Sequence, residues 1–129
     1  MEKMTQLSIA IENAPGQLGR LCRALAQANV NIRGISVSDG TDVSTVRLVV
    51  SDVAAATKVL REAGVQCVSQ DVLVLELEDK PGALERVASR LGEAGVNVHY
   101  IYGTGDSGHK GVMVLRVSDV DRARQALVR

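Results

Sequence analysis

The hydrophobic and polar positions of the chain follow one pattern that occurs twice. Apolar residues alternate with polar or small ones in residues 5–12 (TQLSIAIE), and in residues 71–78 (DVLVLELE) Leu73, Leu75 and Leu77 occupy the matching apolar positions 66 residues later. Alternation with period two predicts a β-strand with one apolar face. A Pro-Gly pair follows each run, and apolar residues then recur at helical spacing from Leu18 and from Leu84. Each copy therefore begins with a strand and an amphipathic helix that packs on it.

A second strand is predicted after each helix, with an irregular apolar pattern. The alternation slips from Val30 and Ile32 to Ile35, and it slips at the matching place in the second copy. A β-bulge or burial of both strand faces would explain the slip, and we favour burial of both faces near the strand end. A third strand follows, and the sequence Ser-Asp-Val at residues 51–53 and 118–120 then opens a second helix with Ser or Asp as N-cap.

This order predicts an α+β fold of two tandem ferredoxin-like βαββαβ units, with helices on one face and antiparallel sheets joined side by side. The domains are expected at residues 1–70 and 71–129, with residues 65–69 as the fourth strand of the first. The second copy ends after its last helix and lacks that strand. The 71–78 strand is then left with an open edge, to be paired by another chain or by rearrangement of residues 65–69, unless the sequence is a truncated form.

Composition and charge narrow the function classes. The 15 basic and 15 acidic residues cancel, so the chain lacks the cationic field that nucleic-acid binding requires. No apolar stretch approaches the roughly 18 residues of a membrane span, and no signal peptide is recognised, so we expect a cytoplasmic protein. The two cysteines form no Cys-x-x-Cys motif, which favours reduced thiols over a disulfide or zinc site.

Other motifs do not indicate catalysis. Residues 103–108 (GTGDSG) match G-x-G-x-x-G, but a strand and not a helix is predicted after them, so we interpret them as a hairpin loop. His99 and His109 have no recognised metal-ligand spacing, and no Ser, His and Asp arrangement stands out. We expect no enzyme, no cofactor and no metal.

The turn and second-strand motifs resemble the ACT domain. The motif residues are Asn13, Pro15, Gly16, Leu18, Asn31 and Ile32 in the first copy, and Asp79, Pro81, Gly82, Leu84, Asn97 and Val98 in the second. The chain is similar to small bacterial proteins made only of two tandem ACT domains. That resemblance implies a non-catalytic regulatory module, which binds an amino acid or related metabolite at an interface between two such domains.

The helix start gives this resemblance a physical basis. Proline fixes φ, and the adjacent glycine lets a ligand approach the amides of the first helical turn, where the helix dipole favours an anion. We expect an α-carboxylate to bind there with a dissociation constant on the order of 10 μM to 1 mM. Asn13 can donate to a carboxylate whereas Asp79 repels it, so the first turn is expected to be the better site.

The rest of the candidate site depends on how the domains pair. If the sheets join along their second strands, the Asn13 turn faces Asn97, Tyr100 and Tyr102, and the Asp79 turn faces Asn31, Gly34 and Ser36. The predicted ligand-binding residues are therefore Asn13, Ala14, Pro15, Gly16, Gln17, Leu18, Asn31, Gly34, Asp79, Pro81, Gly82, Ala83, Leu84, Asn97, Tyr100 and Tyr102. Each also has a purely structural interpretation: a good turn, surface packing of the tyrosines, or local backbone hydrogen bonds of the asparagines.

The functional hypothesis is allosteric sensing of an amino acid by a homodimer, with a possible regulated enzyme as partner. The alternative is a ligand-free interaction subunit of an amino-acid metabolic enzyme. A fragment of such an enzyme is a weaker third possibility.

Overall fold

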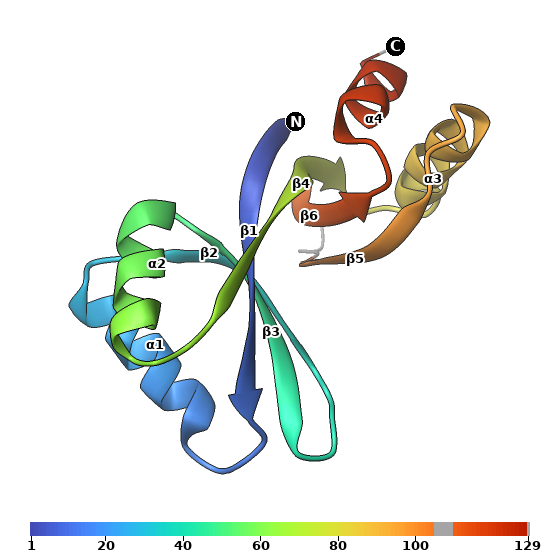
Figure 1. Ribbon diagram of the computed structural model, residues 1–129. Coiled ribbons are helices and arrows are strands. Elements are labelled where there is room, and N and C mark those ends of the chain that lie inside the picture. Colours follow the sequence, from blue (N-terminus) through green and yellow to red (C-terminus); the bar gives the residue numbers. More distant parts are fainter. Residues whose placement is uncertain (105–109, 129) are drawn as a thin grey trace. The chain divides into compact units, whose positions relative to one another are not determined.

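The structure, a computed structural model, describes residues 1–104 and 110–128 (Figure 1). The order strand, helix, strand, strand, helix occurs twice along the chain, which confirms the predicted fold class. None of the described helices is long and apolar enough to span a membrane. The elements are β1 (Glu2–Glu12), α1 (Gln17–Gln27), β2 (Ile32–Ser38), β3 (Val43–Val50), α2 (Val53–Glu62), β4 (Cys67–Glu78), α3 (Ala83–Glu93), β5 (Val98–Thr104), β6 (Lys110–Val117) and α4 (Val120–Leu127).

Residues 5–70 form one compact unit, called the first unit below. Its strand order is β2, β3, β1, β4, and the antiparallel register of β1 on β3 places Leu7 opposite Leu48 and Ile9 opposite Val46. These residues point toward α1 and α2, whose buried side chains complete the core: Leu21, Leu25, Ala56 and Leu60. The apolar face that alternation gives the strands thus packs against the apolar face that helical spacing gives the helices, as the sequence predicts.

Residues 1–4 and 71–129 form the second unit. Its order is β1, β4, β6, β5, with Leu73 opposite Leu115 and Leu75 opposite Met113. Together with α3 and α4, these strands enclose a second core that includes Leu91 and Ala123. The unit therefore repeats the architecture of the first unit.

The N-terminal residues lie in the second unit, although they were expected in the first domain. Lys3 Nζ is 3.8 Å from Asp71 Oδ2 and 3.7 Å from Asp121 Oδ1, which ties β1 to the start of β4 and to α4. No strand follows α4 in the described residues, as predicted, and β1 is the neighbour of β4 in the strand order. The β4 edge was expected to be open. Only residues 2–4 of β1 belong to the same unit as residues 71–78, and Lys3 pairs with Asp71 at the start of that edge.

The expectation that both faces of the second strand are buried is wrong. The register of β2 on β3 shifts between Ile32 and Gly34, and the register of β5 on β6 shifts between Val98 and Tyr100. Beyond the shift Ile35 remains 41% exposed. A β-bulge explains the pattern, because one extra residue reverses the face on which every following side chain lies.

The second strand of each unit stands at the end of the strand order. In the described part of the sheet β2 has β3 as its neighbour and β5 has β6. β1 and β4, with 11 and 12 residues, each contribute residues to both units.

Candidate functional site

The first helix of each unit begins at a glycine with left-handed backbone geometry. Gly16 has φ 86° and Gly82 has φ 88°, and neither helix has a side-chain cap. Glycine adopts this conformation at no steric cost, whereas a side chain there is strained. Because no side chain caps the helix, the first-turn amides depend on the backbone, on water or on a ligand for acceptors.

Three amides in each turn have no protein acceptor within residues 1–104 and 110–128. The Gln17 and Ala83 amides donate to the carbonyls of Ala14 and Lys80, both at 3.3 Å, and the intrahelical ladder starts with Arg20 and Arg86. The other amides of each helix start bond to no described group. They are the amides of Gly16, Leu18 and Gly19 in the first turn, and of Gly82, Leu84 and Glu85 in the second. Such a cluster of unpaired donors at a positive helix end can hold an anion.

Asn13 holds the first turn in place and does not reach toward those amides. Its Nδ2 donates to the Gly40 carbonyl at 2.7 Å, and its backbone amide donates to the Asp42 carbonyl at 2.8 Å. The amide hydrogens that were expected to bind a carboxylate are therefore directed to the loop between β2 and β3. The matching loop of the second unit falls on residues outside the described ranges.

Asn31 and Asn97 fasten the start of the second strand to the end of the third. Their backbone amides donate to Ser51 Oγ at 2.9 Å and to Ser118 Oγ at 3.0 Å, and both serine amides donate back to the asparagine carbonyls at 2.9 Å. The Asn97 Nδ2 also donates to His99 Nδ1 at 3.3 Å. These bonds use the backbone of the asparagines, and the Asn97 carboxamide contacts a side chain, so the structural interpretation of local bonds between asparagine side chains and the backbone stays a prediction.

The same contacts settle which residue caps the second helix. Asp52 Oδ1 accepts from the Ala55 amide, and Asp119 Oδ1 accepts from the Arg122 amide, both at 3.0 Å. Aspartate is therefore the N-cap in both copies, and the preceding serine joins two strands.

The two tyrosines lie together on the sheet face away from the helices. Tyr100 and Tyr102 project from one face of β5, with ring centroids 6.5 Å apart and planes inclined by 16°. Their cross-strand partners are Arg116 and Val114, whereas the core residue Leu115 points to the opposite face. They therefore share the second unit with the Asp79 turn. Gly34 lies on β2 of the first unit, directly after its bulge.

The remaining predicted residues lie in the turns. Pro15 and Pro81 are exposed, while Ala83 is buried. Leu18 and Leu84, 40% and 45% exposed, leave apolar surface beside the unpaired amides.

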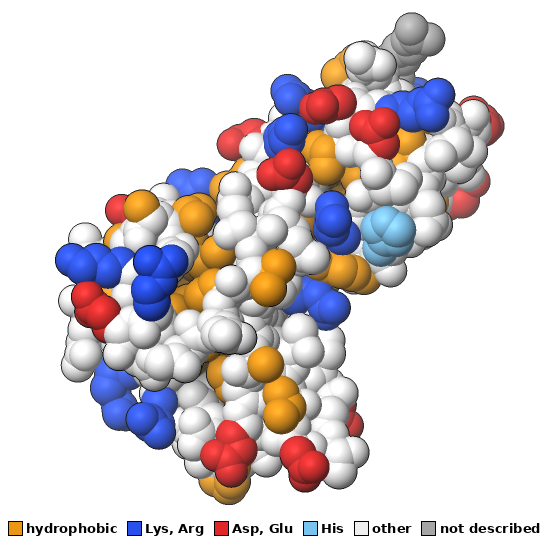
Figure 2. Space-filling model, in the orientation of Figure 1, with side chains coloured by type: hydrophobic (Ala, Val, Ile, Leu, Met, Phe, Trp, Pro, Cys, Tyr) orange, Lys and Arg blue, Asp and Glu red, His pale blue; other side chains and the backbone are white. Residues whose placement is uncertain are grey.

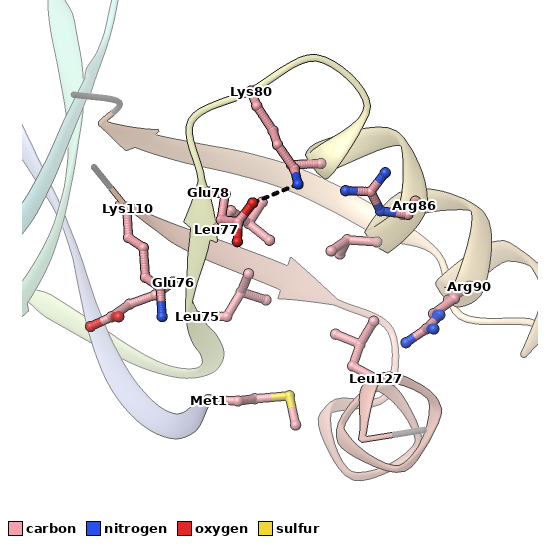
Figure 3. A pocket seen from close by; sticks show the side chains of 12 residues that line it. Met1, Leu75, Glu76, Leu77, Glu78, Lys80, Arg86, Arg90, Lys110 and Leu127 are labelled. Atoms are coloured by element: carbon pink, nitrogen blue, oxygen red, sulfur yellow. Dashed lines mark ion pairs between the residues drawn. The ribbon is translucent and has the colours of Figure 1, made fainter. Parts of the chain in front are cut away.

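A pocket of about 470 Å³ adjoins the second turn and was not foreseen from the sequence (Figure 3). Apolar side chains from β4, α3 and α4 contribute to its lining, and charged side chains stand around them. The lining residues are Met1, Leu75, Glu76, Leu77, Glu78, Lys80, Ala83, Arg86, Val87, Arg90, Lys110 and Leu127. The sequence gives one indication of this pocket when the repeats are compared. Two of its basic lining residues, Lys80 and Arg90, correspond to Ala14 and Ala24 of the first copy.

One ion pair at this pocket perturbs an acidic group. Lys80 Nζ lies 2.6 Å from Glu78 Oε2. The hydrogen bond and charge of Lys80 lower the pKa of the Glu78 carboxyl. On the face of the second unit that is visible in Figure 2, basic and acidic side chains are interspersed.

Metal and nucleotide sites receive no support from the described residues. Within them, no group of three or more His, Cys, Asp or Glu side chains could hold a metal ion. The GTGDSG motif lies outside the described ranges except for Gly103 and Thr104, which end β5, and His109 is also outside them.

Comparison with known proteins identifies the family. The profile of the family described as ACT domain pair matches residues 2–129. The crystal structure of protein BT0572 from Bacteroides thetaiotaomicron is similar with a TM-score of 0.91 and 29% identity, over 98% of this chain and 87% of that one. A search of curated proteins gave no match.

Regulatory proteins share the fold at lower identity. The ligand-free regulatory subunit of aspartate kinase from Thermus thermophilus has a TM-score of 0.75 at 16% identity, over 96% of this chain and 87% of its own. The corresponding subunit from Thermus flavus has a TM-score of 0.68 at 18% identity, over 96% of this chain and 88% of its own. Since the family match runs through both repeats, the chain belongs to the ACT domain pair family.

Proposed function

We propose that this protein is a non-catalytic regulator that binds a small amino acid or related metabolite through the first-turn amides of its ACT units. The observation that carries the proposal is the set of unpaired amides that follows Gly16, together with its copy after Gly82. A ligand α-carboxylate would accept two of these bonds, each contributing about 1.5 to 3 kcal/mol as a charge-assisted hydrogen bond. Because Asn13 is engaged elsewhere, the ligand ammonium group would need another partner.

The second wall of the site would come from another copy of the chain. The β2 edge carries exposed apolar residues, since Ile35 is 41% and Val37 is 47% exposed. Leu18, next to the unpaired amides, is 40% exposed as well. Pairing of two chains along β2 would cover these side chains and bring Asn31 and Gly34 of one copy toward the turn of the other. We therefore propose a homodimer, with Asn97, Tyr100 and Tyr102 at the corresponding wall of the second unit.

Regulation would follow from linkage. A ligand that contacts both copies binds the paired arrangement more tightly than the separate chains and so shifts the population toward it. An enzyme of amino-acid metabolism that distinguishes the two states would respond to the ligand. The regulated enzyme is part of the proposal, in line with the presence of this fold in regulatory subunits of aspartate kinase.

The test is a thermal-shift screen against amino acids, followed by calorimetry on three variants. A ligand at about 100 times its dissociation constant stabilises the folded state by about 2.7 kcal/mol, which raises Tm by several degrees. Leu18→Pro removes an unpaired amide without removing an intrahelical bond, and Leu84→Pro is its counterpart in the second unit. Leu18→Ala keeps the amide and serves as the control.

If the amides bind the carboxylate, at least one proline variant should lose about tenfold or more in affinity, which is the value of one such bond. Leu18→Ala should change affinity less. Wild-type affinity in both proline variants would contradict the proposed site. A panel in which no amino acid raises Tm would contradict the proposed function and favour a ligand-free interaction subunit.

A further inference from the structure

The two cores differ at equivalent positions on their helices. In the first unit Leu21 of α1 is 6% exposed and Leu60 of α2 is fully buried. Their counterparts in the second unit, Val87 of α3 and Leu127 of α4, are only partly buried. The second core is therefore covered less well at one specific place.

In the first unit an extended segment packs against the core. Val65 and Cys67 pack against the core, and the chain then runs on into β4. The carboxamide oxygen of Gln70 accepts from Ser8 Oγ at 3.0 Å and from Gln6 Nε2 at 3.2 Å, which fixes this segment beside β1. Apolar residues at alternate positions of an extended chain thus close the first core.

Among the described residues, the second unit has only a short equivalent. Residues 2–4 of β1 belong to this unit, whereas its part of β4 runs from Asp71 to Glu78. Lys3 pairs with Asp71, and Met1 reaches the pocket lined by Leu75. Leu77 and Leu127 line the same pocket (Figure 3), and from the repeat we infer that the pocket corresponds to the position of the extended segment in the first unit.

The charge around this pocket also distinguishes the two copies. Of the residues that line it, four are basic and two are acidic: Lys80, Arg86, Arg90 and Lys110 against Glu76 and Glu78. Lys80 already neutralises Glu78. The first copy has alanine at the positions of Lys80 and Arg90. An excess of positive charge beside apolar side chains suits a partner that is both apolar and acidic.

We propose that this pocket is a docking groove for an extended acidic segment of another protein. The segment would lie along β4 as an added strand, insert alternate apolar side chains between Leu77, Val87 and Leu127, and place its carboxylates near Arg86 and Lys110. The main chain would provide affinity and the pocket would select the side chains, as in other cases of strand addition. The pocket adjoins the second turn, but the docking proposal does not depend on the amino-acid function proposed above.

Fluorescence anisotropy on the full chain tests the proposal with a labelled peptide, Glu-Val-Gln-Val-Ser-Glu, whose two valines have the same spacing as Val65 and Cys67. One control peptide replaces both Glu by Lys, and a second replaces Gln by Pro to remove a main-chain donor. Arg86→Glu alters the groove, and Arg20→Glu is the matched variant at the same position of the first unit. Arg86→Glu should weaken binding by roughly three- to tenfold, as expected for reversal of an exposed charge, and Arg20→Glu should not.

The proline peptide should bind about tenfold more weakly than its parent, and the lysine peptide should bind more weakly still. Equal binding of the acidic and basic peptides, or equal loss in both arginine variants, would overturn the proposal. Self-association of the chain that Arg86→Glu abolishes would identify a second copy as the occupant and would also overturn the proposal. Displacement of the peptide by hexanoate alone would identify a small carboxylate as the occupant and would overturn the proposal as well. Leu18→Pro, which tests the amino-acid site, should leave peptide binding unchanged.

Discussion

Gly16→Ala is the substitution that most directly tests the backbone geometry of the candidate site. Gly16 has φ +86°, and a Cβ built on it would meet no heavy atom within 4 Å. No clash contributes, so the whole cost comes from placing an L-residue in the left-handed region. That cost is about 1 to 2 kcal/mol. We therefore expect Gly16→Ala to destabilise the protein by this amount.

Gly19→Ala, three residues further along the same helix, is the matched control. A Cβ added at Gly19 would also meet open space, and this residue lies within α1 with ordinary helical geometry. Alanine in a helix interior is more stable than glycine by roughly 0.5 to 1 kcal/mol. The two variants should therefore change stability in opposite directions, by a total of about 1.5 to 3 kcal/mol.

Urea unfolding followed by circular dichroism measures both changes, and a thermal melt should show Tm moving several degrees down for Gly16→Ala and up for Gly19→Ala. Unchanged m values would show that the comparison concerns the folded state. A Gly16→Ala variant as stable as the wild type would refute the left-handed helix start, and with it the arrangement that leaves the first-turn amides unpaired.

Further predictions concern the caps, the cores and one thiol. Asp52→Ala and Asp119→Ala should each cost about 1 kcal/mol in urea unfolding through loss of the N-cap; no loss would show that the caps contribute nothing. Leu60→Ala should cost about 2.7 to 5 kcal/mol because Leu60 is fully buried, and Leu127→Ala clearly less because its position is half-covered; equal losses would contradict the difference between the two cores. Burial raises the pKa of the Cys67 thiol, so its alkylation by iodoacetamide should begin at higher pH in the folded than in the urea-unfolded chain, and identical pH profiles would contradict that burial.

Much of the fold could be predicted because its signals are local and repeated. Leu7 and Ile9 alternate with polar residues and then appear buried on one face, as period two requires. The bulge was misjudged because a slip in alternation has the same form for a bulge and for burial on both faces. The register shift between Ile32 and Gly34 and the exposure of Ile35 separate the two explanations. Residues 2–4 carry no alternation, so their place in the second unit could not be read from the pattern.

The candidate site was less predictable because it depends on distant partners. Asn13 was expected to contact a ligand, yet its carboxamide bonds to Gly40, 27 residues further along the chain. No local pattern gives the position of that loop. Arg86 and Lys110 appear in the sequence as ordinary solvated charges, and only the fold brings them to one pocket. The unpaired amides, by contrast, follow from the Pro-Gly helix start itself.

The central claim is that the first-turn amides, which bond to no group in the described part of the chain, bind the carboxylate of a small ligand. A titration of the ¹⁵N-labelled chain with individual amino acids, followed by two-dimensional NMR, tests it directly. For one amino acid, we predict saturable shifts of the amide signals of Gly16, Leu18 and Gly19, or of their counterparts Gly82, Leu84 and Glu85. Saturable binding that moves none of these six signals, or no saturable shift with any amino acid, would contradict the claim.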